Sequence, residues 1–183
     1  MAAKFDTPEL FKNIEIIDTP AYEADSMVHS SPFVAKAKHN EPLGFPGELV
    51  DNWEEKAVTR LGELVDGSRG LRTFLDSCVK CGACTDKCHY YLGTKDPKNM
   101  PVSRQDLLRS IYRRYYTLAG KHFPKLVGAR DMDKSVLDEW YSYFHQCSQC
   151  RRCSVFCPYG IDTAEISMAA RDIMDTVGQG QKY

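Results

Sequence analysis

The chain has 183 residues, a formal net charge of −1, 43% hydrophobic residues and eight cysteines. This length is sufficient for one domain with its own hydrophobic core, without disulfide cross-links. The balanced charge gives no reason to expect a nucleic-acid partner. No stretch approaches the ~20 apolar residues that cross a membrane, and the first residues lack the apolar segment of a secretory signal. We therefore expect the cysteines to lie in a reducing compartment, where thiols bind metals rather than form disulfides.

The first part of the chain differs from the rest in composition. Residues 1–47 contain five of the nine prolines and show neither helical nor alternating periodicity. Such a segment is typical of an extended or partly disordered arm, and the sequence leaves open whether it binds a partner. We therefore expect an arm at residues 1–47 and a single domain at residues 48–183.

Two helices are expected before the cysteines, because apolar residues recur at helical spacing. The first begins near Trp53 and ends at Gly67. A short second helix, around residues 71–75, leads into the first cysteines.

Three more helices are expected further along the chain. The third follows Pro101, where Ser103 and Asp106 form a capping-box pattern. The fourth covers residues 136–144 and leads into the second group of cysteines. The last has its own cap and ends at Gly178. That cap is Asp162 with Glu165, flanked by Ile161 and Ile166 as a hydrophobic staple.

No convincing run of alternating residues occurs, so the expected fold class is mainly α-helical. Some 58 residues separate Cys88 from Cys147, far more than a compact β-rich ferredoxin needs between its two half-sites. The expected fold is therefore an α-helical ferredoxin-like domain, with two copies of a cysteine motif followed by a helix.

All eight cysteines fall into two copies of the pattern C-x2-C-x2-C-x3-C. The first run comprises Cys78, Cys81, Cys84 and Cys88. The second run comprises Cys147, Cys150, Cys153 and Cys157. Three thiolates within seven residues can hold one part of an iron–sulfur cube while the fourth ligand comes from elsewhere. The pattern therefore predicts two [4Fe–4S] clusters and an electron carrier.

In two-cluster ferredoxins the fourth cysteine of each run ligates the other cluster. On this pattern the first cluster is held by Cys78, Cys81, Cys84 and Cys157. The second cluster is held by Cys147, Cys150, Cys153 and Cys88. The crossing would clamp the two halves of the domain together, and loss of Cys88 would damage the second site rather than the first.

Zinc and the nearby histidines offer alternatives to this ligand set. Zinc also binds paired cysteines, but it would leave the third cysteine of each run unexplained. We interpret His89, which follows Cys88, as a packing residue beside the site rather than a ligand, and His145 as packed at a helix end. No catalytic residue is identified, and no nucleotide, flavin or haem motif occurs.

The basic residues near the cysteines are most simply interpreted as side chains on the solvated surface. Those within the runs could also offset cluster charge, and they are Lys80, Lys87, Arg151 and Arg152. Those on the third helix could also dock an acidic partner, and they are Arg109, Arg113 and Arg114.

The two cysteine runs, the long helical insert and the segment from Cys157 to Asp162 resemble the α-helical ferredoxin superfamily. Within it, the chain resembles the heterodisulfide-reductase C-type iron–sulfur subunits. Residues 77–88, 93–101 and 109–116 are similar to the N-terminal part of the DsrK family. These are iron–sulfur subunits of a membrane complex that serves dissimilatory sulfite reduction. The resemblance covers roughly residues 50–183.

The resemblance implies a place in an electron-transfer chain. A membrane subunit with haem b would take electrons from quinol, and this domain would pass them to a cysteine-rich catalytic domain. That domain would reduce a disulfide or trisulfide on the small carrier protein DsrC. The resemblance also implies a cytoplasmic position, peripherally attached to the inner face of the cell membrane through a partner subunit.

Several alternatives stay open at this point. The chain contains no Cys-Cys dipeptide of the kind found in that catalytic domain, so we expect no sulfur-reducing activity of its own. It is either part of a longer subunit or a stand-alone C-type subunit. An enzyme that cleaves a disulfide directly, and a structural or oxygen-sensing iron–sulfur protein, are the other hypotheses.

Overall fold

The computed structural model describes residues 47–180, so the predicted arm lies outside the described residues except for its last residue. Within the described part, the chain forms helices and no strand, which confirms the mainly α-helical class. The longer helices are α2 (Trp53–Gly67), α3 (Arg69–Ser77), α5 (Pro101–Tyr116), α8 (Lys134–His145) and α10 (Thr163–Thr176). The shorter ones are η4 (Thr85–Lys87), α4 (His89–Thr94), η5 (Pro97–Asn99), α6 (Leu118–His122), α7 (Pro124–Val127) and α9 (Arg152–Val155).

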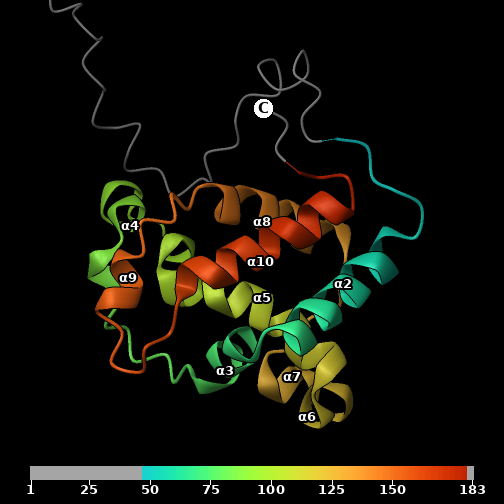
Figure 1. The fold of residues 1–183 in the computed structure, drawn as a ribbon, viewed down its shortest axis with the longest axis horizontal. Helices are drawn as coiled ribbons and strands as arrows, with labels where there is room; N and C mark the ends of the chain where they lie inside the picture. Colours follow the sequence, from blue (N-terminus) through green and yellow to red (C-terminus); the bar gives the residue numbers. More distant parts are fainter. Residues whose placement is uncertain (1–46, 181–183) are drawn as a thin grey trace, which may run out of the picture.

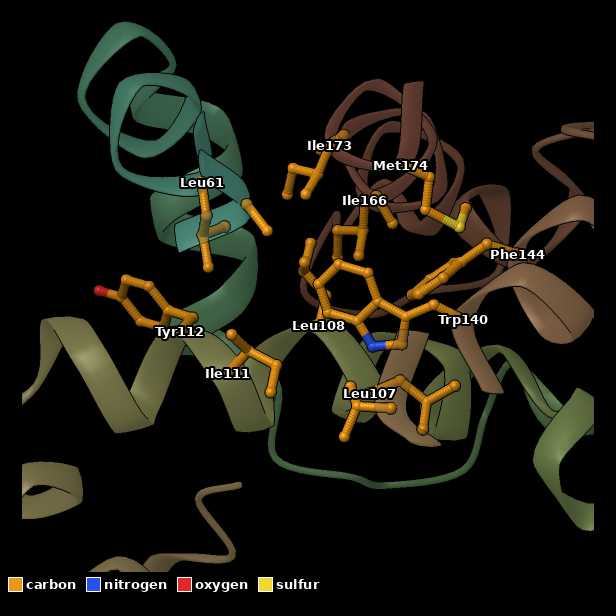
Figure 2. Close-up of a cluster of buried hydrophobic side chains, with 14 of the residues drawn as sticks. Leu61, Leu107, Leu108, Ile111, Tyr112, Trp140, Phe144, Ile166, Ile173 and Met174 are labelled. Atoms are coloured by element: carbon orange, nitrogen blue, oxygen red, sulfur yellow. The ribbon is translucent and has the colours of Figure 1, made fainter. Parts of the chain in front are cut away.

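Helix α10 is the central element of the described domain. It packs against α2, α5 and α8, and Figure 1 shows it lying across the middle of the molecule. Its apolar stripe is fully buried, as the spacing predicts, with Ile166 and Ile173 completely covered. Figure 2 shows these side chains beside Trp140 and Phe144 of α8, whose rings meet edge to face at 5.6 Å. Burial of this apolar stripe is the main contribution that holds α2, α5 and α8 together around α10.

The start of α10 is stabilised by its own cap, as predicted. A carboxylate oxygen of Asp162 accepts hydrogen bonds from the backbone N–H groups of Ala164 and Glu165. Glu165 does not bond back to the cap, however. Its carboxylate accepts from the hydroxyl of Ser68 at 3.1 Å, and Ser68 caps α3. Glu165, the second residue of the expected capping box, therefore links α10 to the start of α3 instead of capping α10.

The start of α5 differs from the prediction. The helix begins at Pro101, which needs no hydrogen-bond partner for its nitrogen at a first helical position. Ser103 and Asp106 therefore lie inside the helix, and the predicted capping box at these residues is wrong. Asp106 instead pairs with Lys80 of the first run at 2.8 Å.

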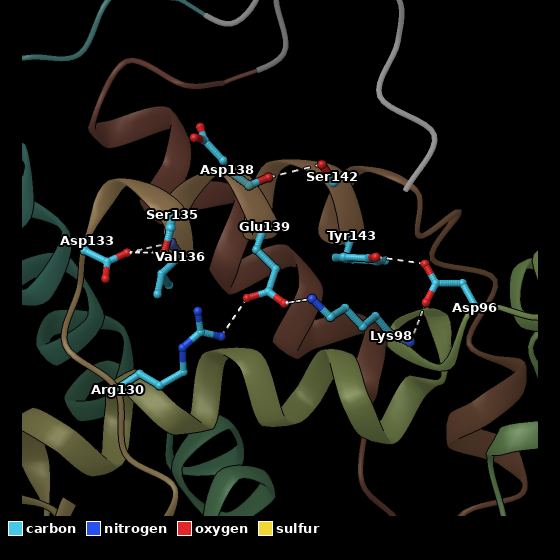
Figure 3. Close-up of polar contacts among 10 residues, drawn as sticks. All are labelled: Asp96, Lys98, Arg130, Asp133, Ser135, Val136, Asp138, Glu139, Ser142 and Tyr143. Atoms are coloured by element: carbon cyan, nitrogen blue, oxygen red, sulfur yellow. Dashed lines mark hydrogen bonds and ion pairs between the residues drawn. The ribbon is translucent and has the colours of Figure 1, made fainter. Parts of the chain in front are cut away.

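A polar network ties α8 to the segment that follows the first run (Figure 3). The carboxylate of Glu139 forms ion pairs with Lys98 and Arg130, each with a nitrogen–oxygen distance of 2.6 Å. The hydroxyl of Tyr143 donates to the buried carboxylate of Asp96 at 2.8 Å. Because the first run lies just before this segment and the second run just after α8, the network fixes both parts of the chain relative to each other.

The two ends of the described chain meet. The N–H of Val50 donates to the carbonyl of Val177 at 3.2 Å, and the amide of Gln179 donates to the carbonyl of Gly47. Gly178 has a positive φ of 88° and lies against the carbonyl of Glu48, where a Cβ atom has no room. In Figure 1 this meeting point lies at the opposite end of the molecule from α4 and α9.

Among residues 47–180, no helix combines the length and the apolar character needed to cross a membrane.

Candidate metal centre

Both cysteine runs lie in loops at one end of the molecule. The first run connects α3 to α4 and contains η4. The second run connects α8 to α10 and contains α9. Helix α9 contacts η4, so the two loops lie side by side, at the left of Figure 1.

The two loops have the same unusual backbone. In the first run, the residues on either side of the second cysteine are left-handed, with φ of 56° at Lys80 and 78° at Gly82. The matching residues of the second run, Gln149 and Arg151, have φ of 56° and 57°. Left-handed residues in tight loops turn successive N–H groups toward one concave side, an arrangement that binds anions. Three of the four are not glycine, and such residues adopt this conformation at a cost that a bound group can offset.

The side chains of the two runs surround two cavities. The first cavity is lined by Cys78, Cys81, Cys84 and Cys157. The second cavity is lined by Cys88, Cys147, Cys150 and Cys153. Each cavity thus receives three cysteines from one run and the fourth from the other, which is the grouping that crossed ligation requires.

In each run it is the third cysteine, Cys84 or Cys153, whose thiol pKa is raised. Burial raises the pKa of the Cys84 thiol to about 11, with further contributions from the Cys153 and Cys78 thiolates. Burial also raises the pKa of Cys153, and Cys147 and Cys88 act in the same direction. Several thiolates held this closely repel one another, so a cationic group must bind among them before their protons are released. Iron ions in a cluster meet this need.

Arginines from two helices bind the chain where each run begins. The guanidinium of Arg109 on α5 donates to the carbonyl of Cys78 at 2.8 Å. The guanidinium of Arg171 on α10 donates to the carbonyl of Cys147 in the same way. Arg109 is 6% exposed, so the prediction that it lies on a solvated face is wrong. Its neighbour Arg114 pairs with Asp131, and Arg113 bonds the carbonyl of Val127.

Sequence reasoning missed a third arginine, Arg104. Its guanidinium lies 3.6 Å from the sulfur of Cys88 and is 2% exposed. The sequence did contain a signal, because Arg104 precedes Leu107, Leu108 and Ile111 by three, four and seven residues. A cation on the apolar stripe of a helix is unusual and indicates a buried anionic or polar partner.

The two histidines near the runs lie close to their expected positions. His89 lines the second cavity, with its Nδ1 atom 4.0 Å from the sulfur of Cys150 and its Nε2 atom 3.3 Å from the hydroxyl of Ser148. His145 is the last residue of α8 and packs edge to face against Tyr141. Burial lowers the pKa of His145 to about 4, and the charge of Arg171 acts in the same direction.

Comparisons with known proteins point to the same kind of centre. Residues 74–161 match the family described as a 4Fe-4S dicluster domain. Over 136 residues the chain is 53% identical to the Hdr-like menaquinol oxidoreductase iron-sulfur subunit of Archaeoglobus profundus, covering 74% of this chain and 24% of the relative. The identity and coverage are the same for iron-sulfur subunit 2 of the Archaeoglobus fulgidus enzyme.

A more distant relative is a subunit of the dihydromethanophenazine:CoB–CoM heterodisulfide reductase of Methanosarcina barkeri. It is 32% identical over 106 residues, which are 58% of this chain and 25% of the relative. The chain therefore spans about a quarter of the length of these curated relatives. No solved structure matches the chain.

Proposed function

Because residues 74–161 match a 4Fe–4S dicluster domain, we propose that the chain is an electron carrier that holds two [4Fe–4S] clusters. The observation that carries the proposal is the arrangement of the cysteines, four around each of two neighbouring cavities. A [4Fe–4S] cluster needs four thiolate ligands and supplies a site that accepts and releases one electron.

The proposed ligands follow the lining of the two cavities. The first cluster is held by Cys78, Cys81, Cys84 and Cys157. The second cluster is held by Cys147, Cys150, Cys153 and Cys88. The protein contributes the thiolates, the concave loops and the arginines that fix the start of each run. Since all eight cysteines are used as ligands, the chain keeps no thiol for attack on a substrate.

The proposal is tested on anaerobically prepared protein by iron and sulfide analysis and by electron paramagnetic resonance. About eight iron atoms per chain are expected. Two interacting signals should appear after addition of dithionite and disappear after reoxidation. A protein with full metal content that stays silent on reduction would contradict the electron-carrier role, and zinc in place of iron would contradict the cofactor.

Crossed and uncrossed ligation predict opposite results when the fourth cysteine of a run is replaced. In the crossed arrangement the replacement damages the site of the other run, and in the uncrossed arrangement it damages the site of its own run. Cys88→Ser should perturb the signal of the second site and leave the first site intact, because the Cys88 sulfur lines only the second cavity. Cys157→Ser is the matched variant and should perturb the first site. The two signals are identified independently with Cys81→Ser and Cys150→Ser, whose sulfurs lie in the first and the second cavity. If Cys88→Ser instead alters the same signal as Cys81→Ser, the ligation is not crossed.

We further propose that the chain works within a larger oxidoreductase, either as one part of a long subunit or as a stand-alone C-type subunit. The names of its relatives support this, since they describe subunits of a menaquinol oxidoreductase and of a heterodisulfide reductase. A membrane subunit with haem b would supply electrons from quinol, and a cysteine-rich catalytic domain would receive them. The chain would then lie on the cytoplasmic side of the membrane, attached through that partner.

The finer proposal is a DsrK-type role, with a disulfide or trisulfide of DsrC as the final electron acceptor. It is tested with membranes that contain the complete complex. Menaquinol should reduce the clusters, and addition of oxidised DsrC should reoxidise them. Reoxidation by a small heterodisulfide but not by DsrC would favour the heterodisulfide-reductase role instead. A cluster signal that responds only to oxygen would favour the sensing alternative.

A further inference from the structure

Arg104 differs from the other cations at this end of the molecule. Its side chain is fully covered by protein, and each of its partners is formally neutral or a thiol. The Nε atom donates to the carbonyl of Tyr143 at 3.0 Å, and one terminal nitrogen donates to the side-chain oxygen of Asn99 at 2.7 Å. The other terminal nitrogen points at the sulfur of Cys88. Its position is therefore fixed by three contacts on all sides of the guanidinium.

The cations within the two runs, unlike Arg104 on α5, lie in solvent or have acidic partners. These ion pairs are Lys80 with Asp106, Lys87 with Asp86, and Arg151 with Asp162. Exposed pairs of this kind are screened by water and have little effect on a buried group. Arg109 and Arg171 also contact the runs, but they donate to backbone carbonyls of Cys78 and Cys147. Arg104 is thus the cation of the described residues that donates to a cysteine sulfur.

Burial of an arginine without a carboxylate partner is costly, because the charge loses its hydration. The cost is offset when an anion lies within hydrogen-bond distance. The Cys88 sulfur is the atom that supplies this anion once it is a thiolate ligand of an iron–sulfur cluster. The pairing of Arg104 with Cys88 therefore fits a loaded second site better than a site of neutral thiols.

The two cavities differ in charge although they are alike in their cysteines. No charged side chain lines the first cavity within the described residues, and apolar groups such as Val79, Val102 and Ile161 surround it. Arg104 and Arg151 line the second cavity. The fourth residue of α5 is Arg104, whereas the fourth residue of α10 is the apolar Ile166. The asymmetry is therefore built into the two helices that follow the runs.

We infer that Arg104 raises the reduction potential of the second cluster above that of the first, so that the electron on the domain resides at the second site. A hydrogen bond from a cation to a ligating sulfur stabilises the more negative, reduced state of a cluster. One electron then leaves the first site, which is oxidised, and enters the second site, which is reduced. The inference rests on the proposed two-cluster function and assigns a direction within it.

The test is an anaerobic redox titration of the loaded protein followed by electron paramagnetic resonance. Wild-type protein should show two midpoint potentials, with the second site reduced first. Arg104→Met should lower the potential of the second site and leave the first nearly unchanged. Arg104→Lys should give a smaller shift, because it keeps the charge but loses the fork of donors.

Arg109→Met is the matched control. It removes an arginine from the same helix that is also buried, but this arginine contacts a backbone carbonyl and not a sulfur. Its effect on the second site should be smaller than that of Arg104→Met. Equal shifts at the second site from both variants would show a general loss of charge or structure, and the assigned role of Arg104 would be wrong.

A second variant keeps the test decisive if Arg104→Met does not load. Asn99→Asp places a carboxylate on the guanidinium and cancels its charge without removing any atom of Arg104. The potential of the second site should fall in the same direction. Two reversible clusters with an unchanged second potential in Asn99→Asp would overturn the inference but leave the electron-carrier role standing. The absence of reducible clusters in wild-type protein would instead overturn the proposed function itself.

Discussion

Glu139 on α8 forms ion pairs with two basic side chains, Lys98 and Arg130 (Figure 3). Burial alone raises the pKa of a carboxyl group, but the hydrogen bonds from the two cations outweigh it, and the pKa of Glu139 lies below its usual range. Glu139→Gln should therefore lower the free energy of unfolding by roughly 1–2 kcal/mol at neutral pH. Denaturant unfolding of both proteins measures this difference.

The effect of Glu139 depends on pH in a defined direction. Because its folded-state pKa is depressed, its contribution is complete above the unfolded value of about 4.3 and is lost as the pH falls through the lower folded value. The difference between wild type and Glu139→Gln should thus be constant from pH 7 to about pH 5 and shrink at lower pH. A difference that stays constant below pH 4 would show that no depressed carboxylate contributes. Comparing the two proteins at each pH cancels any common effect of acid on the clusters.

At the scale of single residues, the sequence predicted how the cysteines group around the two cavities better than it predicted the charged residues beside them. In two-cluster ferredoxins the spacing of the cysteines follows the geometry of the cluster, so such a grouping is visible in the sequence. Arg104 meets Cys88 and Asn99 only through the fold, and no spacing rule relates these residues. The same holds for Arg109, whose charge suggested a solvated surface but whose helix turns it inward.

The stability of helix α10 depends on its N-cap, Asp162. The Asp162 carboxylate accepts hydrogen bonds from the first free N–H groups of the helix, and it also accepts one from the hydroxyl of Ser154 in α9. Asp162→Ala should lower the free energy of unfolding by about 1 kcal/mol or somewhat more. Asp162→Asn keeps the cap acceptor and should retain most of the stability. Thermal unfolding of the loaded proteins measures both. Equal losses in the two variants would show that the pairing with Arg151, not the cap, is the important interaction.

The longer helices could be read from the sequence and the short ones could not. Helices α2, α3, α8 and α10 have apolar stripes long enough to show their period. Elements such as α7 and α9, with four residues each, span little more than one helical turn, which is too short for a period to show, and they are formed by their surroundings. The start of α5 was misplaced because the Ser103 pattern competes with Pro101: the helix begins at Pro101 with Met100 as its N-cap, not after Ser103.

For the whole domain, α10 lies across the middle and packs against α2, α3, α5, α8 and α9, whereas α6 and α7 lie at the periphery (Figure 1). Leu118 and Leu126 on these two short helices are 79% and 85% exposed. Hydrogen exchange should therefore be slowest at amides of α10 such as Ala170 and Ile173, and fastest in α6 and α7. The measurement uses the loaded chain and mass spectrometry. Exchange in α10 as fast as in α7 would contradict a core organised around α10.

The meeting of Gly47 with Gln179, far from the cysteine loops, has a consequence for how the domain combines with others. A fold whose two ends leave at one place can be inserted into, or fused with, another protein at little cost to its own structure. Here the junction is also remote from both cavities. This arrangement would allow other domains to be joined on either side of the unit while its cysteine loops, at the opposite end, are left undisturbed.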